Sequence, residues 1–165
     1  MRRSIALLLV LLMLAGCAIK PSPLYRDRTS SLEAQLPLVS RDDLLNELSM
    51  YHGVRYEEGG NSLSGMDCSG LVHSVFGSLG VSLPRTAAEQ FAHGIPLGRE
   101  DVRTGDLIFF GSGSRPRHVG IAMSCREMMH ASSSRGVVLE DIDAFSKTSE
   151  LVGVRRIVRL GGTSS

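Results

Sequence analysis

Apolar residues recur at the spacing of one helical face in the segment that follows Asp67. The residues of this stripe are Leu71, Val72, Val75, Phe76 and Leu79. The pattern predicts a helix that begins at Cys68, is weakened at Gly77 and ends at Gly80. Cys68 precedes Leu71 and Val72 by three and four positions, so its side chain is expected on the same inward face.

Capping residues predict two further helices. Ser40 precedes a helical run that extends to Met50, with two aspartates in its first turn. Thr86 and Glu89 have the spacing of a capping box, which predicts a short helix that carries Gln90.

Short apolar runs in the second half of the chain predict strands. Residues 107–110 form a continuous apolar run after a Gly-Asp turn, which is typical of a buried strand. Further strands are expected around His118, around His130, at 137–139 and at 152–158. The order of elements predicts an α+β fold, in which helices come first and the Cys68 helix packs on a mostly antiparallel sheet of about five strands.

The two strand histidines are predicted to lie on one face of the sheet. Residues 124–126 form the expected turn between their strands, and a three-residue turn pairs Ile121 with Met129. His118 and His130 then become diagonal neighbours, close enough for their imidazoles to meet. A turn of even length would place them on opposite faces. The other face carries residues that suit a core, namely Val119, Ile121, Met129 and Ala131.

Cys68 is the candidate nucleophile. Unpaired N–H groups at a helix start carry partial positive charge, which predicts a lowered thiol pKa. A buried structural cysteine behind an Asp67 cap is the alternative for this residue considered alone. Two histidines on one face, downstream of a cysteine at a helix start, favour a nucleophile, a base and a residue that orients the base.

Several motifs, in this order, resemble the NlpC family of bacterial cell-wall cysteine peptidases. The resemblance covers about residues 44–158. In the printed sequence the motifs are Tyr56 ahead of a Gly-Gly pair, DCSGLV at 67–72, LPRT at 83–86 with Gln90, GDLIFF at 105–110, HVGI at 118–121 and HAS at 130–132. Two features depart from the family pattern: Glu57 and Glu58 both stand between Tyr56 and the Gly pair, and Ser-Cys-Arg replaces a turn usually rich in Gly and Asn.

The resemblance implies a papain-like fold and a peptidase that acts on peptidoglycan. Cys68 would be the nucleophile, His118 the general base and His130 the residue that orients it. The substrate would be a stem peptide or cross-bridge of peptidoglycan, cut at a D-Glu–diaminopimelate or a D-Ala–diaminopimelate bond.

Three further residues are candidates for contact with the oxyanion or the substrate. They are Tyr56, which is otherwise a half-buried loop tyrosine, Ser69 beside the nucleophile, and Arg85, whose alternative role is a solvated flank of a helix. Helix-start N–H groups, including that of Cys68, are expected to hold the oxyanion.

The N-terminus predicts export and lipidation. Two arginines and an apolar run from Ile5 to Leu14 mark a signal peptide of residues 1–16. Residues 14–17, Leu-Ala-Gly-Cys, resemble a lipoprotein signal, in which Cys17 carries the lipid, including palmitate; the alternative is an ordinary cleavable signal. Ala18 resembles the residue found there in lipoproteins of the outer membrane. Residues 17–39 are expected to be a tether, 40–160 the enzyme domain and 161–165 a disordered tail.

Charge and composition exclude several other classes. Loss of Arg2 and Arg3 with the signal leaves 16 basic against 17 acidic residues, and no basic stripe indicates nucleic acid. The chain has no Trp, and no CxxC or HExxH spacing predicts a metal, so neither metal nor cofactor is expected. Cys125 is left over and could pair with Cys68. We expect a monomer.

Two other functions remain open from the sequence. One is a catalytically idle scaffold, anchored by lipid, that binds wall peptides or an envelope partner in the same cleft. The other is an acyltransferase or an amidase that acts on a different substrate through the same cysteine.

Overall fold

Six antiparallel strands form the main sheet of the structure, a computed structural model that describes residues 30–162. The strand order is β4-β9-β5-β6-β7-β8. The strands are β4 (Ile95–Leu97), β5 (Leu107–Ser112), β6 (Arg115–Ala122), β7 (Glu127–Ser132), β8 (Gly136–Asp141) and β9 (Glu150–Arg156). The five predicted strands are confirmed, and the sixth is the short edge strand β4. Its central Pro96 hides it from strand patterns, because proline cannot donate to a ladder.

Side-chain caps begin the helices where the sequence predicted them. Ser40 accepts a hydrogen bond from the backbone of Asp43 at the start of α3 (Arg41–Tyr51). Thr86 and Glu89 form the predicted capping box of α5 (Ala87–Gln90). The remaining helices are α4 (Cys68–Ser78), α6 (Ile142–Phe145) and the 3-10 helix η1 (Arg99–Asp101).

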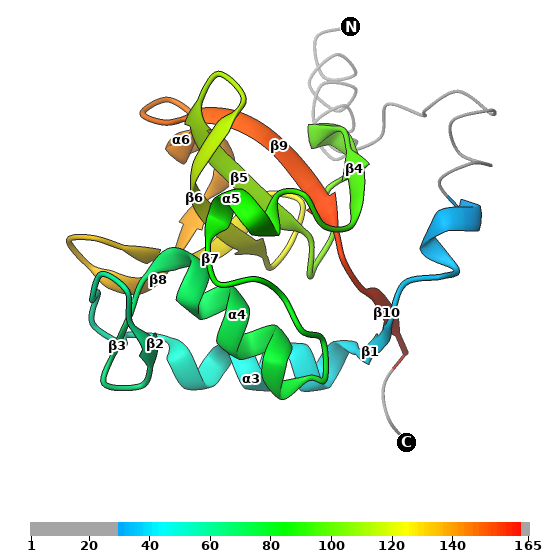
Figure 1. The fold of residues 1–165 in the computed structure, drawn as a ribbon, viewed down its shortest axis with the longest axis horizontal. Coiled ribbons are helices and arrows are strands. Elements are labelled where there is room, and N and C mark those ends of the chain that lie inside the picture. Colours follow the sequence, from blue (N-terminus) through cyan, green and yellow to red (C-terminus); the bar gives the residue numbers. More distant parts are fainter. Residues whose placement is uncertain (1–29, 163–165) are drawn as a thin grey trace, which may run out of the picture.

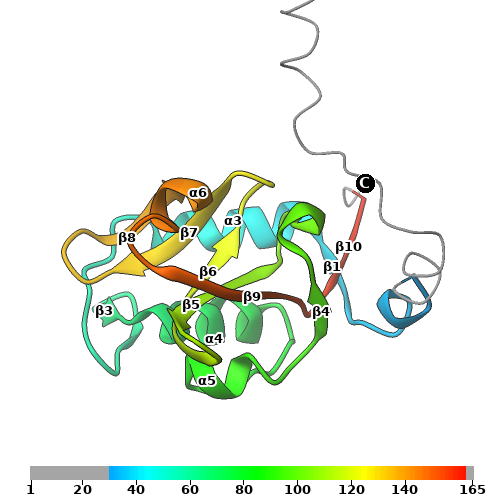
Figure 2. The same cartoon turned by 90° about the horizontal axis from the view of Figure 1, so that it is seen from above.

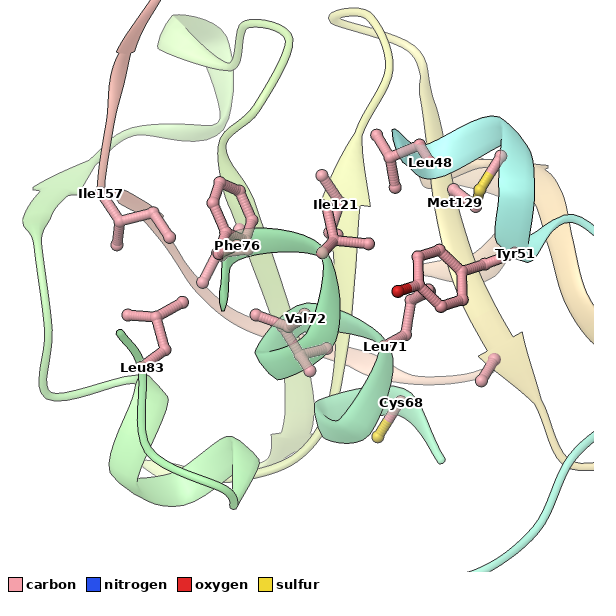
Figure 3. Close-up of a cluster of buried hydrophobic side chains, with 14 of the residues drawn as sticks. Leu48, Tyr51, Cys68, Leu71, Val72, Phe76, Leu83, Ile121, Met129 and Ile157 are labelled. Carbon is pink, nitrogen blue, oxygen red and sulfur yellow. The ribbon is translucent and has the colours of Figure 1, made fainter. Parts of the chain in front are cut away.

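The main core lies between one face of the sheet and helices α3 and α4, which run side by side in Figure 1. Leu71, Val72 and Phe76 of α4 pack with Ile121 and Met129 of the sheet (Figure 3). A smaller cluster covers the opposite face, where α6 packs; it consists of Val102, Ile108, Phe110, Ala122, Met128, Ile142 and Val154. The sheet is therefore buried on both faces over its middle strands.

Strands β6 and β7 pair only near their connecting turn. Ile121 pairs with Met129, as predicted, and Ala122 pairs with Met128. Towards His118 the ladder between these strands stops. The pairing of β5 with β6 also shifts register there, because β6 contains one extra residue, Arg117, next to His118. The strands therefore separate at the end of β6 where the histidines lie, which leaves room for side chains between them.

The domain begins earlier than predicted. Strand β1 (Leu38–Ser40) pairs in parallel with β10 (Arg159–Gly161), so both ends of the domain lie side by side (Figure 2). Glu33 forms an ion pair with the buried Arg156. Part of the expected tether thus contacts the domain, through Glu33 and through β1. Cys17, the signal peptide and residues 163–165 lie outside the described residues.

Candidate active site

Cys68 is the first residue of α4, behind a small hairpin of β2 (Asn61–Ser62) and β3 (Gly65–Met66). It lies at one end of the core cluster in Figure 3 and is 9% exposed. Its sulfur accepts backbone N–H bonds, including one from Val119, the residue after His118 on β6. The start of α4 therefore meets the His118 strand.

Asp67 caps α4 and is itself held by Arg85. The carboxylate accepts a 2.6 Å bond from the backbone N–H of Gly70, and both of its oxygens accept bonds from the Arg85 guanidinium at 2.9 and 2.8 Å. Arg85 also donates to the Ser69 hydroxyl and the Gly60 carbonyl. Burial opposes ionisation of Asp67, but the Arg85 and backbone bonds hold its pKa below the usual value. The predicted Asp67 cap is confirmed.

Arg85 and Ser69 therefore lie at the site within a structural network. The sequence did not predict that Arg85 would bind Asp67, 18 residues away, since neither residue type nor local spacing indicates a specific long-range ion pair. Ser69 is buried, and its carbonyl accepts a bond from Gln90. These contacts fix the backbone N–H groups of the helix start, where an oxyanion would bind.

A close backbone approach requires glycine at position 70. A Cβ atom there would lie 2.1 Å from the carbonyl oxygen of Gly60, which is closer than any real contact. The Gly-rich loop before the hairpin thus presses directly against the helix start.

His118 and His130 lie on one face of the sheet, which confirms the prediction from turn length. Nε2 of His118 is 2.8 Å from Nδ1 of His130. His130 is 1% exposed, whereas His118 is partly exposed at the separated end of β6 and β7. The buried imidazole therefore holds the more accessible one.

Glu140 extends this pair and was missed in the sequence. Its Oε2 lies 2.9 Å from Nε2 of His130, and it also binds Arg135. Glu140 pairs with Met128 across β7 and β8, which makes it a diagonal neighbour of His130 on the same face. The predicted strand ended at Leu139, and its extension by one residue would have revealed the contact.

Phe145 of α6 covers both imidazoles, and it too was missed. Burial is the largest effect on His118, and the neighbouring His130 acts in the same direction, whereas the charge of Glu140 opposes both. Together these effects lower the pKa of His118 to about 4. His118 is therefore neutral at physiological pH, as a base must be.

The predicted lowering of the Cys68 pKa is wrong for the substrate-free site. Burial raises the pKa of the thiol, and the charge of Asp67 adds to this effect. Backbone N–H bonds from Val119, Ser69 and Cys68 itself act in the opposite direction but do not prevail. The helix start thus does stabilise the thiolate, but desolvation costs more.

Tyr56 lies close enough to Cys68 to interact with its charge. Burial raises the pKa of Tyr56, and the charges of Cys68 and Asp67 add to the increase. The phenol is therefore a protonated donor within range of the charge of Cys68.

Cys125 lies elsewhere, on the turn that joins β6 to β7. This turn follows the C-terminal end of β6, whereas His118 lies in the N-terminal half of that strand. Neither it nor Cys68 forms a disulfide. Bridged Cα atoms lie within about 7 Å, so the pairing considered from the sequence would require a large rearrangement.

Within residues 30–162, no group of three or more His, Cys, Asp or Glu side chains is arranged to hold a metal ion. No helix in the same range is both long and apolar enough to cross a membrane.

Comparisons with known proteins agree with this geometry. Residues 53–156 match the model of the NlpC/P60 family. The chain is 37% identical over 119 residues to the murein DD-endopeptidase MepS/murein LD-carboxypeptidase of Escherichia coli K12, which covers 72% of this chain and 62% of that protein. It is 33% identical over 140 residues to the probable endopeptidase NlpC of the same strain, covering 83% and 88%.

A crystal structure of an NlpC/P60 family protein from Bacillus cereus ATCC 10987 has a similar fold. The TM-score is 0.69 at 30% identity, over 75% of this chain and 42% of that one. This chain thus spans less than two thirds of the length of that protein and of the E. coli DD-endopeptidase.

Proposed function

The chain belongs to the NlpC/P60 family, and from this premise we propose that it is a cysteine peptidase that hydrolyses an amide bond in peptidoglycan. The observation that carries the proposal is the placement of Cys68 at a helix start against Val119 of β6, the residue that follows a neutral His118 held by His130. This combination supplies a nucleophile, a base and an orienting residue.

The chemistry follows from the protonation states. Both Cys68 and His118 are neutral in the substrate-free site, so the thiol proton passes to His118 as the sulfur attacks the scissile carbonyl. A carbon–sulfur bond forms, the carbon–nitrogen bond breaks, and the amine leaves with the proton from His118. Water then hydrolyses the thioester: His118 takes a proton from the water, a carbon–oxygen bond forms and the carbon–sulfur bond breaks. The sulfur takes the proton back from His118, which restores the thiol and releases the carboxylic acid product.

Backbone N–H groups at the start of α4 would stabilise the oxyanion. Loss of one such donor typically reduces the rate by ~10²–10³-fold. The Tyr56 hydroxyl, which is protonated and interacts with the charge of Cys68, would donate a further bond to the oxyanion or the substrate. Arg85 supports these N–H groups indirectly, because it binds the Asp67 carboxylate that caps α4.

The proposed substrate is a stem peptide or cross-bridge, cut at a D-Glu–diaminopimelate or D-Ala–diaminopimelate bond. The name of one relative, a murein DD-endopeptidase, supports the second bond.

Mass spectrometry of purified peptidoglycan after incubation with the protein tests the proposal. Muropeptide products identify the bond, and Cys68→Ala should abolish them. Cys125→Ala, which changes a thiol on a distant turn, is the matched control and should retain activity. If the wild type produced no products but bound wall peptides, the idle scaffold would replace the peptidase.

We also propose that the protein is a lipoprotein, anchored through Cys17 at the periplasmic face of the outer membrane. The support lies in the sequence alone: the apolar run from Ile5 to Leu14, the Leu-Ala-Gly-Cys signal and Ala18.

A further inference from the structure

Glu140 lies at the end of a hydrogen-bonded line that leads to His118. His130 occupies the middle, 2.8 Å from His118 through Nδ1 and 2.9 Å from Glu140 through Nε2. Its near-complete burial leaves these two side chains as its polar neighbours along the line. The hydrogen bond between Glu140 and Nε2 of His130 therefore determines whether Nδ1 of His130 carries a proton, and so whether it donates to His118 or accepts from it.

The carboxylate of Glu140 can only accept hydrogen bonds when ionised. Burial raises its pKa, but bonds from His130 and Arg135 outweigh this and hold it below the usual value. Nε2 of His130 must then carry a proton. A neutral His130 consequently has a bare Nδ1, which accepts a bond from Nε2–H of His118.

This leaves Nδ1 of a neutral His118 unprotonated, which is the form that can take a proton from Cys68. Without Glu140, His130 could carry its proton on either nitrogen. A proton on Nδ1 of His130 would point at Nε2 of His118 and force the His118 proton onto Nδ1. The base would then be blocked.

We propose that Glu140 is a positioning residue, which sets the tautomers of both His130 and His118 so that Nδ1 of His118 is free to act as the base. Its negative charge also stabilises the imidazolium that forms on His118 when the thiol proton arrives. Arg135, an exposed residue that binds Glu140, holds the carboxylate in place. The catalytic consequence rests on the proposed peptidase function; the tautomer assignment does not.

Nitrogen-15 NMR of histidine-labelled, substrate-free protein tests the assignment directly, because protonated and bare imidazole nitrogens have distinct shifts. In the wild type, both His118 and His130 should carry their protons on Nε2. Glu140→Ala should give a mixture of tautomers at both rings. Unchanged tautomers in this variant would overturn the proposal, whatever the activity of the wild type.

Kinetics provide the second measurement. Glu140→Ala should reduce kcat on the order of 10²-fold with little change in KM, because a wrong tautomer disables the base and not substrate binding. Glu140→Gln, whose amide oxygen can still accept from Nε2 of His130, should lose less. Glu127→Gln, an exposed change on β7, is the matched control and should be neutral. If both Glu140 variants lost the same activity, and the loss matched an equal loss of folded protein, the positioning role would be contradicted.

Discussion

The ring of Phe145 stacks on that of His118, with centroids 5.3 Å apart and planes 28° from parallel. An apolar ring in this position keeps water from the imidazole and so disfavours its charged form. His118 acts as a base only when neutral, so activity falls as the pH drops through its pKa. We expect kcat/KM of the wild type to decline only near pH 4, and Phe145→Ala to move this decline towards pH 6.5.

Phe91→Ala is the control for this change. Phe91 is also a partly buried phenylalanine, but it packs on Phe109 and Arg155, away from the two histidines. Phe91→Ala should leave the decline of kcat/KM at acidic pH, the acid limb of the profile, unchanged. An unchanged acid limb in Phe145→Ala would show that this ring does not desolvate the base.

Stability should fall on acidification because of His118. Its folded pKa, about 4, lies below the ordinary 6.5, so the unfolded chain takes up a proton first as the pH falls. Stability is lost progressively between pH 6.5 and 4, by roughly 2 kcal/mol from pH 7 to 4.5. His118→Gln should remove this part of the pH dependence in urea denaturation at the two pH values. Identical pH dependence in variant and wild type would contradict the lowered pKa.

Arg85 should contribute to folding as well as to activity. Arg85→Ala leaves Asp67 without its ion pair, with an expected loss of about 1–3 kcal/mol. The matched control is Arg55→Ala, which breaks an exposed ion pair with Glu57 and should cost less than about 1 kcal/mol. Thermal unfolding measures both. A raised KM at unchanged stability would instead identify Arg85 as a substrate ligand.

Cys68 should ionise late in the substrate-free protein. Because burial raises its pKa, alkylation of the peptide that contains Cys68 should follow an apparent pKa above the roughly 8.5 of a free cysteine. The measurement is iodoacetamide modification against pH, read by mass spectrometry. An apparent pKa below 7 would indicate a thiolate–imidazolium pair at rest and would reverse this part of the mechanism.

Lipidation should depend on Cys17. Metabolic labelling with a palmitate analogue should mark the wild type and miss Cys17→Ala. Cys125→Ala should label like the wild type. Unlabelled wild-type protein in the soluble periplasmic fraction would disprove the anchor.

The elements of the fold could be predicted because their signals are local. The α4 helix is encoded by apolar residues at helical spacing behind Asp67, and the capping box of α5 lies within four residues. The face shared by His118 and His130 also followed from local information, since the length of one turn sets strand register and register sets side-chain direction.

The protonation states and the residues that support the base depended on tertiary structure. Phe145 reaches the histidines only because α6 folds back over them, and no local pattern encodes that approach. Glu140 reaches His130 through the pairing of β7 with β8, once that strand is extended past Leu139. The Cys68 thiol is the clearest case. A helix start predicts a lowered pKa from local dipoles, but the pKa is raised because the whole core removes water from the sulfur, and burial is a property of the packed chain.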